Sequence, residues 1–218
     1  MNITVAGILV AGGKSSRMGG GDKCMRLLAG KPILEHIIER VGPQVSQLVI
    51  NTNGDPKRFS SFGLQVILDS VDGYFGPLAG VLSGMEWTKK NLSDCKWIVT
   101  IATDTPFLPA NLVQRLIEAA TNYSADVTFA SSAQRRHPVF GLWPVSLSDD
   151  LRHALIHEGI RKIDHWANKY NCVEVAFDEE LVDPFFYINK PDDLVQAELL
   201  LDSYKLSTNN NYIHSKKG

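Results

Sequence analysis

The residues of this sequence that are best suited to chemistry lie in a glycine-rich stretch just after an apolar run near the N-terminus. Residues 8–23 read ILVAGGKSSRMGGGDK. Five glycines let this backbone turn sharply and approach a bulky anion, and successive backbone N–H groups in such a loop form an anion-binding concavity. Arg17 and Lys23 add fixed positive charge. The stretch therefore predicts a phosphate site that handles a nucleoside triphosphate.

Two common phosphate loops are excluded by their spacing. A Walker A loop requires a glycine five residues before Gly13-Lys14-Ser15, and that position is Ile8. A Rossmann fingerprint requires three glycines spaced G-x-G-x-x-G directly after the strand, which Gly12-Gly13 followed by lysine does not supply. A flexible surface loop is the alternative, but a strand, paired glycines, Arg and Lys at one strand end favour a ligand site.

Asp104 is the strongest candidate for a metal ligand. It follows the apolar run KWIVTIA within the tetrad Thr-Asp-Thr-Pro, so a buried strand would aim its carboxylate at the edge where ligands bind. Mg²⁺ binds through one or two protein carboxylates together with substrate phosphates and waters. An ordinary turn aspartate before Thr105-Pro106 is the alternative.

Asn51 and Asp69 lie at the ends of two further apolar runs, QLVIN and LQVIL. A carboxylate accepts hydrogen bonds from both N1–H and the exocyclic amine of guanine, whereas adenine presents an acceptor at N1. Asp69 is therefore a suitable reader of guanine; a capping or turn role, or a contact to ribose or metal, is the alternative. The other expected base and ribose contacts are backbone atoms of small or apolar residues: Val10, Ala11, Gly12 and Gly13.

The elements that would position these residues alternate between strands and helices. Apolar runs and turn signals predict strands at residues 3–10, 47–51, 64–68, 96–102, 127–130, 139–143, 173–177 and 185–188. Helical spacing predicts helices at residues 33–41, 76–89, 112–120, 147–157, 161–169 and 192–204. This order predicts an α/β fold, a single three-layer α/β/α Rossmann-like domain with a mostly parallel sheet. Ligands bind such sheets beyond the carboxyl ends of the strands, where the candidate residues fall.

Composition narrows the class of protein. The chain has 218 residues, 44% of them hydrophobic, which suits one sizeable core and is short for two. A net charge of −2 argues against a nucleic-acid or membrane surface. Three separated cysteines and the lack of a signal-peptide pattern predict a cytoplasmic protein. We expect one domain over residues 1–206 and a polar, disordered tail over residues 207–218.

The opening of the chain resembles that of a known family. VAGGKSSRMGGGDK followed by LLAGKPILEHIIERV is similar to the opening signature of nucleotidyltransferases with a GT-A-like fold, and most similar to the molybdenum cofactor guanylyltransferases. The resemblance extends from Ile3 to about Glu198. It implies a nucleotide-diphospho-sugar transferase-like fold and transfer of GMP from GTP to Mo-molybdopterin. The products would be Mo-molybdopterin guanine dinucleotide and pyrophosphate, with Mg²⁺ as cofactor.

The resemblance also implies roles for single residues. Arg17, Lys23 and Asp104 would be catalytic, with Asp104 on Mg²⁺ and the two cations on phosphate charge. Asn51 and Asp69 would both contact the nucleotide. Asn189 resembles a position near the metal and the acceptor, although an N-cap of the last helix is an equal alternative. The family's Asn-x-Asn pattern is broken here by Tyr187, which puts one acceptor contact in doubt. A further acceptor site is expected in a cationic loop, with a solvated hairpin tip as the alternative: Arg135, Arg136 and His137.

Three other functions compete with this one. A CTP-dependent molybdopterin cytidylyltransferase would use the same chemistry on another base. A carrier that binds GTP and molybdopterin without turnover would keep the pockets and need no catalytic set. A sugar-phosphate nucleotidyltransferase would need a sugar motif, which we do not find. Molybdoenzymes or their chaperones would receive the product.

Overall fold

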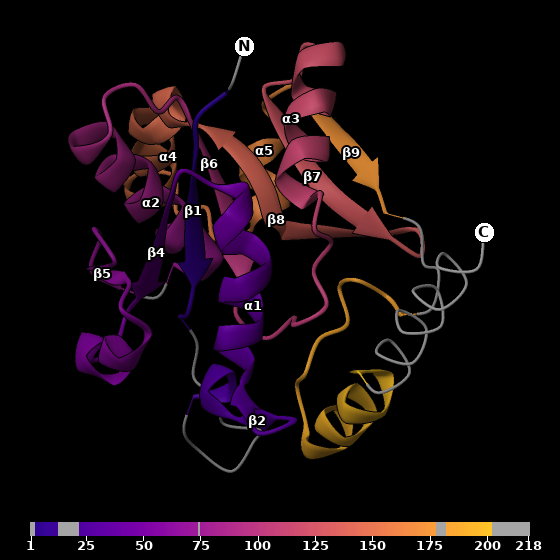
Figure 1. Ribbon diagram of the computed structural model, residues 1–218. Coiled ribbons are helices and arrows are strands. Elements are labelled where there is room, and N and C mark those ends of the chain that lie inside the picture. Colours follow the sequence, from indigo (N-terminus) through magenta and orange to yellow (C-terminus); the bar gives the residue numbers. More distant parts are fainter. Residues whose placement is uncertain (1–2, 13–21, 74, 178–181, 202–218) are drawn as a thin grey trace.

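A seven-stranded sheet forms the centre of the computed structural model, which describes residues 3–12, 22–73, 75–177 and 182–201 of the chain (Figure 1). The strand order is β5-β4-β1-β6-β8-β7-β9. In chain order these strands are β1 (Val5–Val10), β4 (Gln47–Thr52), β5 (Gln65–Leu68), β6 (Trp97–Ala102), β7 (Val127–Ser132), β8 (Arg135–Pro144) and β9 (Cys172–Ala176). A separate short ladder pairs β2 (Leu27–Leu28) with β3 (Lys31–Pro32).

The strands around β1 are parallel and end at the same level. Val10, the last residue of β1, pairs with Asn51 of β4 on one side and with Ala102 of β6 on the other. β5 continues this parallel half of the sheet, with Leu68 beside Thr52. The residues that follow these strands therefore meet at one edge.

β8 runs antiparallel between β6 and β7, so the sheet is mixed but mostly parallel. A two-residue turn at Ala133 and Gln134, with φ of 47° and 60°, joins β7 to β8. The sequence predicts a loop at residues 135–138, and this is wrong. The tight turn brings Arg135 directly opposite Ser132, so β8 begins at once.

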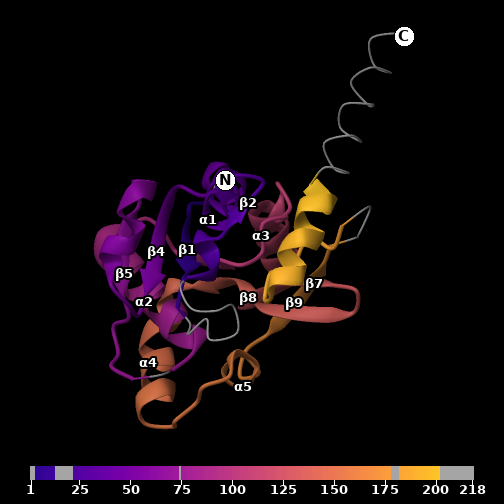
Figure 2. The same ribbon diagram turned by 90° about the horizontal axis from the view of Figure 1, so that it is seen from below.

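Helices cover both faces of the sheet and complete three layers (Figures 1 and 2). One core lies under α1 (Ile33–Val41), α3 (Leu112–Asn122) and the helix at residues 191–201. The other core lies under α2 (Pro77–Asn91), α4 (Ser148–Ile156) and α5 (Ile163–Ala167). Short 3₁₀ helices are η2 (Lys23–Met25), η3 (Gly42–Gln44), η4 (Pro56–Phe62) and η5 (Val145–Leu147). No helix among the described residues is long and apolar enough to cross a membrane.

Two elements of the C-terminal third differ from the prediction. Residues 185–188 are irregular, because the N–H of Phe185 bonds to the Asp183 carboxylate and that of Ile188 to the Asp104 carbonyl. Both apolar side chains are buried, although their segment does not pair as a strand with the described sheet. The helix expected at residues 161–169 spans only Ile163–Ala167, since the N–H groups of Lys169 and Tyr170 bond three residues back, as in 3₁₀ turns. The domain limits remain a prediction, and residues 207–218 lie outside the described residues.

Candidate active site

Polar groups gather at the edge where β1, β4, β5 and β6 end. The Ala11 N–H donates to the carbonyl oxygen of Asn51 at 2.8 Å, and the Thr103 hydroxyl lies 3.5 Å from the carbonyl oxygen of Val10. These contacts tie the ends of β4 and β6 to the end of β1. The predicted site residues at this edge are Val10, Ala11, Gly12, Asn51, Asp69 and Asp104.

A cavity of about 340 Å³ opens beside these strand ends. It is lined by Val10, Gly12, Asn51, Asn53, Asp69, Gly73, Phe75, Gly76, Pro77 and Gly80. Its volume lies at the lower end of the range for small-molecule sites, so it suits one heterocyclic base better than a whole nucleotide. We call it the base pocket.

Asn51 and Asp69 form a polar pair in the wall of the base pocket. Asn51 is 1% exposed, and its Nδ2 donates to Asp69 Oδ1 at 3.0 Å. Burial raises the pKa of the Asp69 carboxyl, while the hydrogen bond from Asn51 lowers it. A ligand N–H that reaches this partly desolvated carboxylate would form a stronger hydrogen bond than in water.

The start of α2 packs closely against this pair because it carries glycine. A Cβ at Gly80 would lie 2.6 Å from Asn51 Oδ1 and 2.9 Å from Val10 Cγ1. Gly76, just before α2, has a φ of +63°, which glycine adopts readily. Next to it, Phe75 presents its ring to the pocket and carries the Arg161 guanidinium 4.0 Å from its centroid.

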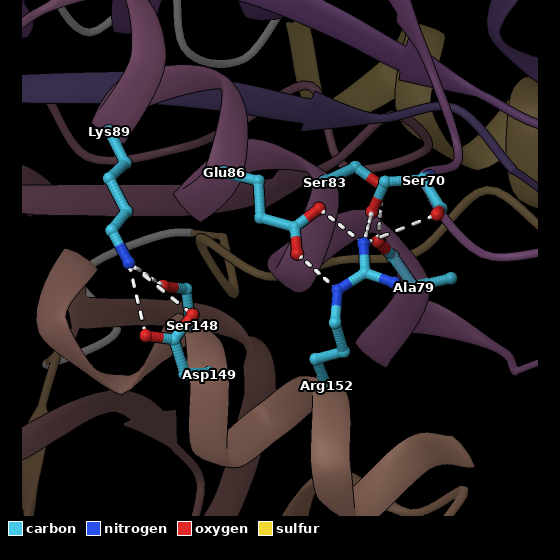
Figure 3. Close-up of polar contacts among 8 residues, drawn as sticks. All are labelled: Ser70, Ala79, Ser83, Glu86, Lys89, Ser148, Asp149 and Arg152. Carbon is cyan, nitrogen blue, oxygen red and sulfur yellow. Dashed lines mark hydrogen bonds and ion pairs between the residues drawn. The ribbon is translucent and has the colours of Figure 1, made fainter.

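The segment after Asp69 is held by hydrogen bonds from α2 and α4 (Figure 3). The Ser70 N–H donates to the Ser83 hydroxyl at 2.9 Å, and that hydroxyl donates to the Ala79 carbonyl at 2.7 Å. Arg152 of α4 binds both carboxylate oxygens of Glu86, at 2.7 and 2.8 Å, and reaches the Ser70 carbonyl at 3.3 Å. This network fixes the backbone next to the base pocket.

Lys23 joins the N-terminal and C-terminal parts of the site. Its Nζ donates to Asn189 Oδ1 at 2.7 Å and lies 3.8 Å from Asp104 Oδ2. The Ile188 N–H also donates to the Asp104 carbonyl at 2.9 Å. Three predicted site residues, Lys23, Asp104 and Asn189, therefore lie together. The helix cap that was the alternative for Asn189 comes from Asp193 instead, which accepts from the N–H groups of residues 189 and 190.

The Asp104 carboxylate, the predicted metal ligand, is largely shielded from solvent. Burial raises the pKa of its carboxyl, and Lys23 opposes this shift. In the part of the chain that the structure describes, no three His, Cys, Asp or Glu side chains gather as a metal cluster. A single sheltered carboxylate fits Mg²⁺, which takes most of its ligands from substrate phosphates and water.

Arg58 is a site residue that the sequence analysis missed. Its guanidinium donates to Asp22 Oδ1 at 2.7 Å and to the Thr52 hydroxyl at 2.6 Å. It thus anchors the end of the glycine-rich stretch to the end of β4. Asp22 pairs with Arg58, whereas the next residue, Lys23, lies against Asp104. Gly13 and Arg17 lie outside the described residues.

The predicted cationic acceptor loop is not a cluster of three exposed cations. His137 is 2% exposed, and burial lowers the pKa of its ring. Arg136 forms ion pairs with Glu174 and, at 3.2 Å, with Asp164. Arg135 is exposed, and its guanidinium lies 5.6 Å from the Tyr187 ring. Only Arg135 of the three keeps the exposure that the prediction assumed.

Comparison with known proteins shows the family of this chain. Residues 7–171 match the model of the MobA-like NTP transferase domain. A molybdenum cofactor guanylyltransferase from Mesorhizobium japonicum is 49% identical over 206 residues, which cover 93% of this chain and 99% of the relative. Another, from Bradyrhizobium sp., is 46% identical over 90% of this chain and 92% of its own. The chain belongs to the molybdenum cofactor guanylyltransferase family.

Solved structures confirm the fold of this guanylyltransferase family member. Molybdopterin-guanine dinucleotide biosynthesis protein A from Archaeoglobus fulgidus superposes with a TM-score of 0.73 at 26% identity, over 92% of this chain and 100% of that protein. A CMP:2-keto-3-deoxy-manno-octonic acid synthetase, at 14% identity, shares the fold with a TM-score of 0.67 over 92% of this chain and 99% of its own. The expected nucleotide-diphospho-sugar transferase-like α/β fold is thus confirmed, and the protein is a nucleotidyltransferase.

Proposed function

We propose that the protein transfers GMP from GTP to the phosphate of Mo-molybdopterin, forming Mo-molybdopterin guanine dinucleotide and pyrophosphate. One observation carries this proposal. The base pocket, with Asp69 in its wall, lies at the same strand-end edge as Lys23 and Asp104. Thr103, the neighbour of Asp104, contacts the Val10 carbonyl, and Val10 also lines the pocket. A nucleotide can therefore place its base in the base pocket and its phosphates beside Lys23 and Asp104.

The reaction needs positioned charge more than it needs acid–base chemistry. An oxygen of the acceptor phosphate forms a bond to the α-phosphorus of GTP, and the bond from that phosphorus to the β-phosphate bridge breaks. The electron pair leaves with pyrophosphate. Lys23 holds positive charge where the phosphate oxygens gain negative charge, and we assign the same role to Arg17 from its place in the glycine-rich stretch.

Asp104 is the residue that would hold Mg²⁺, with Lys23 and Asn189 orienting the groups around it. When bound, the metal would neutralise charge on the phosphate oxygens. Asn189 accepts a hydrogen bond from Lys23 at 2.7 Å, which fixes the direction in which the ammonium points. The remaining two N–H donors of Lys23 then face Asp104 and the space for phosphate.

Asp69 is the residue that we assign to guanine recognition. Its Oδ1 is engaged by Asn51, and the carboxylate keeps lone pairs for the N1–H and the exocyclic amine of the base. Backbone atoms of Val10, Ala11, Gly12 and Gly13 complete the base and ribose contacts. On the acceptor side, Arg135 and Asn189 are the candidates for binding the molybdopterin phosphate.

A comparison of the four nucleoside triphosphates tests this function. Purified protein with Mg²⁺ and Mo-molybdopterin should release pyrophosphate with GTP, form the guanine dinucleotide by mass spectrometry, and do neither without acceptor. Preference for CTP would identify a cytidylyltransferase and overturn the guanine assignment. Tight GTP binding without release of pyrophosphate would identify a carrier and overturn the enzyme assignment.

A further inference from the structure

Four polar side chains form a continuous hydrogen-bonded chain beside the active site. The Ser132 hydroxyl, at the end of β7, donates to Asp183 Oδ1 at 2.8 Å. The same hydroxyl lies 2.8 Å from His137 Nε2. On the other side of the ring, His137 Nδ1 lies 3.2 Å from the Tyr187 hydroxyl. The order Asp183, Ser132, His137, Tyr187 leads from an acidic group at one end to a phenol at the other.

Counting protons gives this chain a direction. A hydroxyl carries one proton, and that of Ser132 is used on the Asp183 carboxylate, which only accepts. Ser132 must therefore accept from His137, so Nε2 of the ring carries the hydrogen. A neutral imidazole has one N–H, which leaves Nδ1 as an acceptor. The Tyr187 hydroxyl then donates its proton inward, to His137.

The surroundings of His137 keep the ring neutral and fixed. The residue is 2% exposed, and its ring stacks on Phe185 with centroids 4.6 Å apart. Burial lowers the pKa of the ring, Arg135 lowers it further, and Asp183 acts in the opposite direction. Asp183 is itself positioned, since its Oδ1 also accepts from the Phe185 N–H at 2.9 Å. The chain is thus anchored at its acidic end.

Tyr187 places the other end of the chain next to the catalytic groups. The next residue, Ile188, donates its N–H to the Asp104 carbonyl, and Asn189 binds Lys23. Burial raises the pKa of the Tyr187 phenol to about 12, and the nearby Asp104 carboxylate contributes. The exposed Arg135 guanidinium lies over its ring. The phenol therefore stays protonated and lies among the residues that we assign to the acceptor.

We propose that Tyr187 is a specificity-determining residue for the acceptor, because Asp183, Ser132 and His137 hold its hydroxyl proton inward and leave only lone pairs facing the substrate. The phenol oxygen would accept a hydrogen bond from an N–H group on the acceptor's heterocycle. Ser132 and His137 act as positioning residues, and neither needs to touch the substrate. The inference rests on the proposed function only for the identity of the acceptor, since the direction of the chain follows from the contacts.

Kinetics of two substitutions test the proposal. Tyr187→Phe removes the hydroxyl and keeps the ring, so the KM for Mo-molybdopterin should rise about tenfold, as for one lost hydrogen bond, with the KM for GTP unchanged. Ser132→Ala frees His137 to take the other tautomer, which donates to Tyr187 and turns the phenol proton outward. As a single substitution, Ser132→Ala should raise the KM for Mo-molybdopterin. In the Tyr187→Phe background it should cause no further rise in that KM. Additive effects, or a change in the KM for GTP instead, would overturn the proposal.

The tautomer itself supplies a readout that does not depend on turnover. Nitrogen-15 NMR of the labelled protein should show His137 protonated at Nε2 in wild type and in Tyr187→Phe, and at Nδ1 in part of the Ser132→Ala population. Ser131→Ala, on the opposite face of β7, is the matched control and should change neither the tautomer nor the kinetics.

Protonation at Nδ1 in wild type would refute the chain's direction even if guanylyl transfer holds. If wild type shows Nε2–H but no acceptor-dependent turnover, the proposed function fails and Tyr187 loses its assigned acceptor. Should Ser132→Ala fold poorly, Tyr187→Phe and the wild-type tautomer still decide the question.

Discussion

Lys23 Nζ lies 2.7 Å from Asn189 Oδ1, across a separation of 166 residues. The residue at the end of the glycine-rich stretch is thus held by the segment before the last helix. That segment is in turn held to Asp104 through the Ile188 N–H. Contacts between segments that are distant in sequence therefore hold the active site together. We derive a separate prediction for each residue involved.

Loss of the Asn189 side chain should disorient Lys23 without disturbing the fold. For Asn189→Ala we expect kcat to fall by about ten- to a hundredfold, because the ammonium no longer points in one direction toward the phosphates. Lys190→Ala removes the next exposed side chain and is the matched control. Steady-state kinetics with GTP and acceptor measure the effect. Equal, small effects in both variants would contradict the role of Asn189.

Lys23 itself should act on phosphate charge and not on base choice. Lys23→Ala should lower kcat/KM for GTP and for poorer nucleotides by the same factor, about tens to thousands fold. We predict the same for Arg17→Ala. The exposed Lys57 on η4 gives a control, since Lys57→Ala removes equal charge from a side chain that has no assigned role in the site. A variant that changed nucleotide preference would place that residue at the base.

Asp69→Asn tests the guanine assignment. The variant keeps the shape but presents a donor in place of part of the acceptor, so the exocyclic amine of guanine meets an unfavourable partner. GTP should lose much more kcat/KM than ITP, which lacks that amine, by about five- to a hundredfold, as expected for an unmatched hydrogen bond. An equal loss for GTP and ITP would assign Asp69 to ribose, metal or fold.

Substitutions of two glycines in α2 distinguish an effect on the base pocket from an effect on stability. A Cβ at Gly80 would lie 2.6 Å from Asn51 Oδ1, and one at Gly84 2.6 Å from Ile8 Cγ1. Both Gly80→Ala and Gly84→Ala should lower the free energy of unfolding by about 1–3 kcal/mol. Only Gly80→Ala should also raise the KM for GTP, because it displaces the Asn51–Asp69 pair. Denaturant unfolding and kinetics on the same preparations give both readouts, and unchanged nucleotide affinity in Gly80→Ala would contradict the base pocket.

The ionised Asp104 carboxylate should lower the free energy of unfolding of the ligand-free protein. Burial raises the pKa of its carboxyl in the folded state above the ordinary value of 3.8, so the ionised form is disfavoured by folding at any pH above the folded pKa. Asp104→Asn should therefore raise Tm near neutral pH and abolish turnover. The gain in Tm should shrink as pH falls through the folded pKa and vanish below 3.8. A lower Tm for the variant at neutral pH would show that the charge stabilises the fold.

Local signals predicted the parallel half of the sheet and much of its edge. An apolar run followed by a polar residue was enough to place Asn51, Asp69 and Asp104 at strand ends, because adjacent parallel strands end together. Lys23 was predicted from its charge at the end of the glycine-rich stretch, whereas Asn189 was marked only by the family resemblance. Residue spacing alone gives no sign that they touch.

The features that the sequence did not predict depend on long-range pairing. Nothing near Arg58 in sequence announces its bond to Asp22, 36 residues away. The turn at residues 133–134 uses non-glycine residues with positive φ, so the hairpin from β7 to β8 carried no glycine signal. The contacts of Ser132 with Asp183 join segments 51 residues apart, and apolar spacing made residues 185–188 resemble a strand.

Transfer of a labelled α-phosphate distinguishes guanylyl transfer from hydrolysis of GTP and from binding alone. With GTP labelled at the α-phosphate, Mg²⁺ and Mo-molybdopterin, we expect label to appear in the guanine dinucleotide, with one pyrophosphate released for each label transferred. Asp104→Ala, properly folded by circular dichroism, should transfer none. Label that stays on the protein or appears as free GMP would contradict guanylyl transfer to the acceptor. In a parallel reaction with α-labelled CTP, label that reaches the acceptor from CTP and not from GTP would contradict the guanine assignment. Full transfer by Asp104→Ala would contradict the metal assignment.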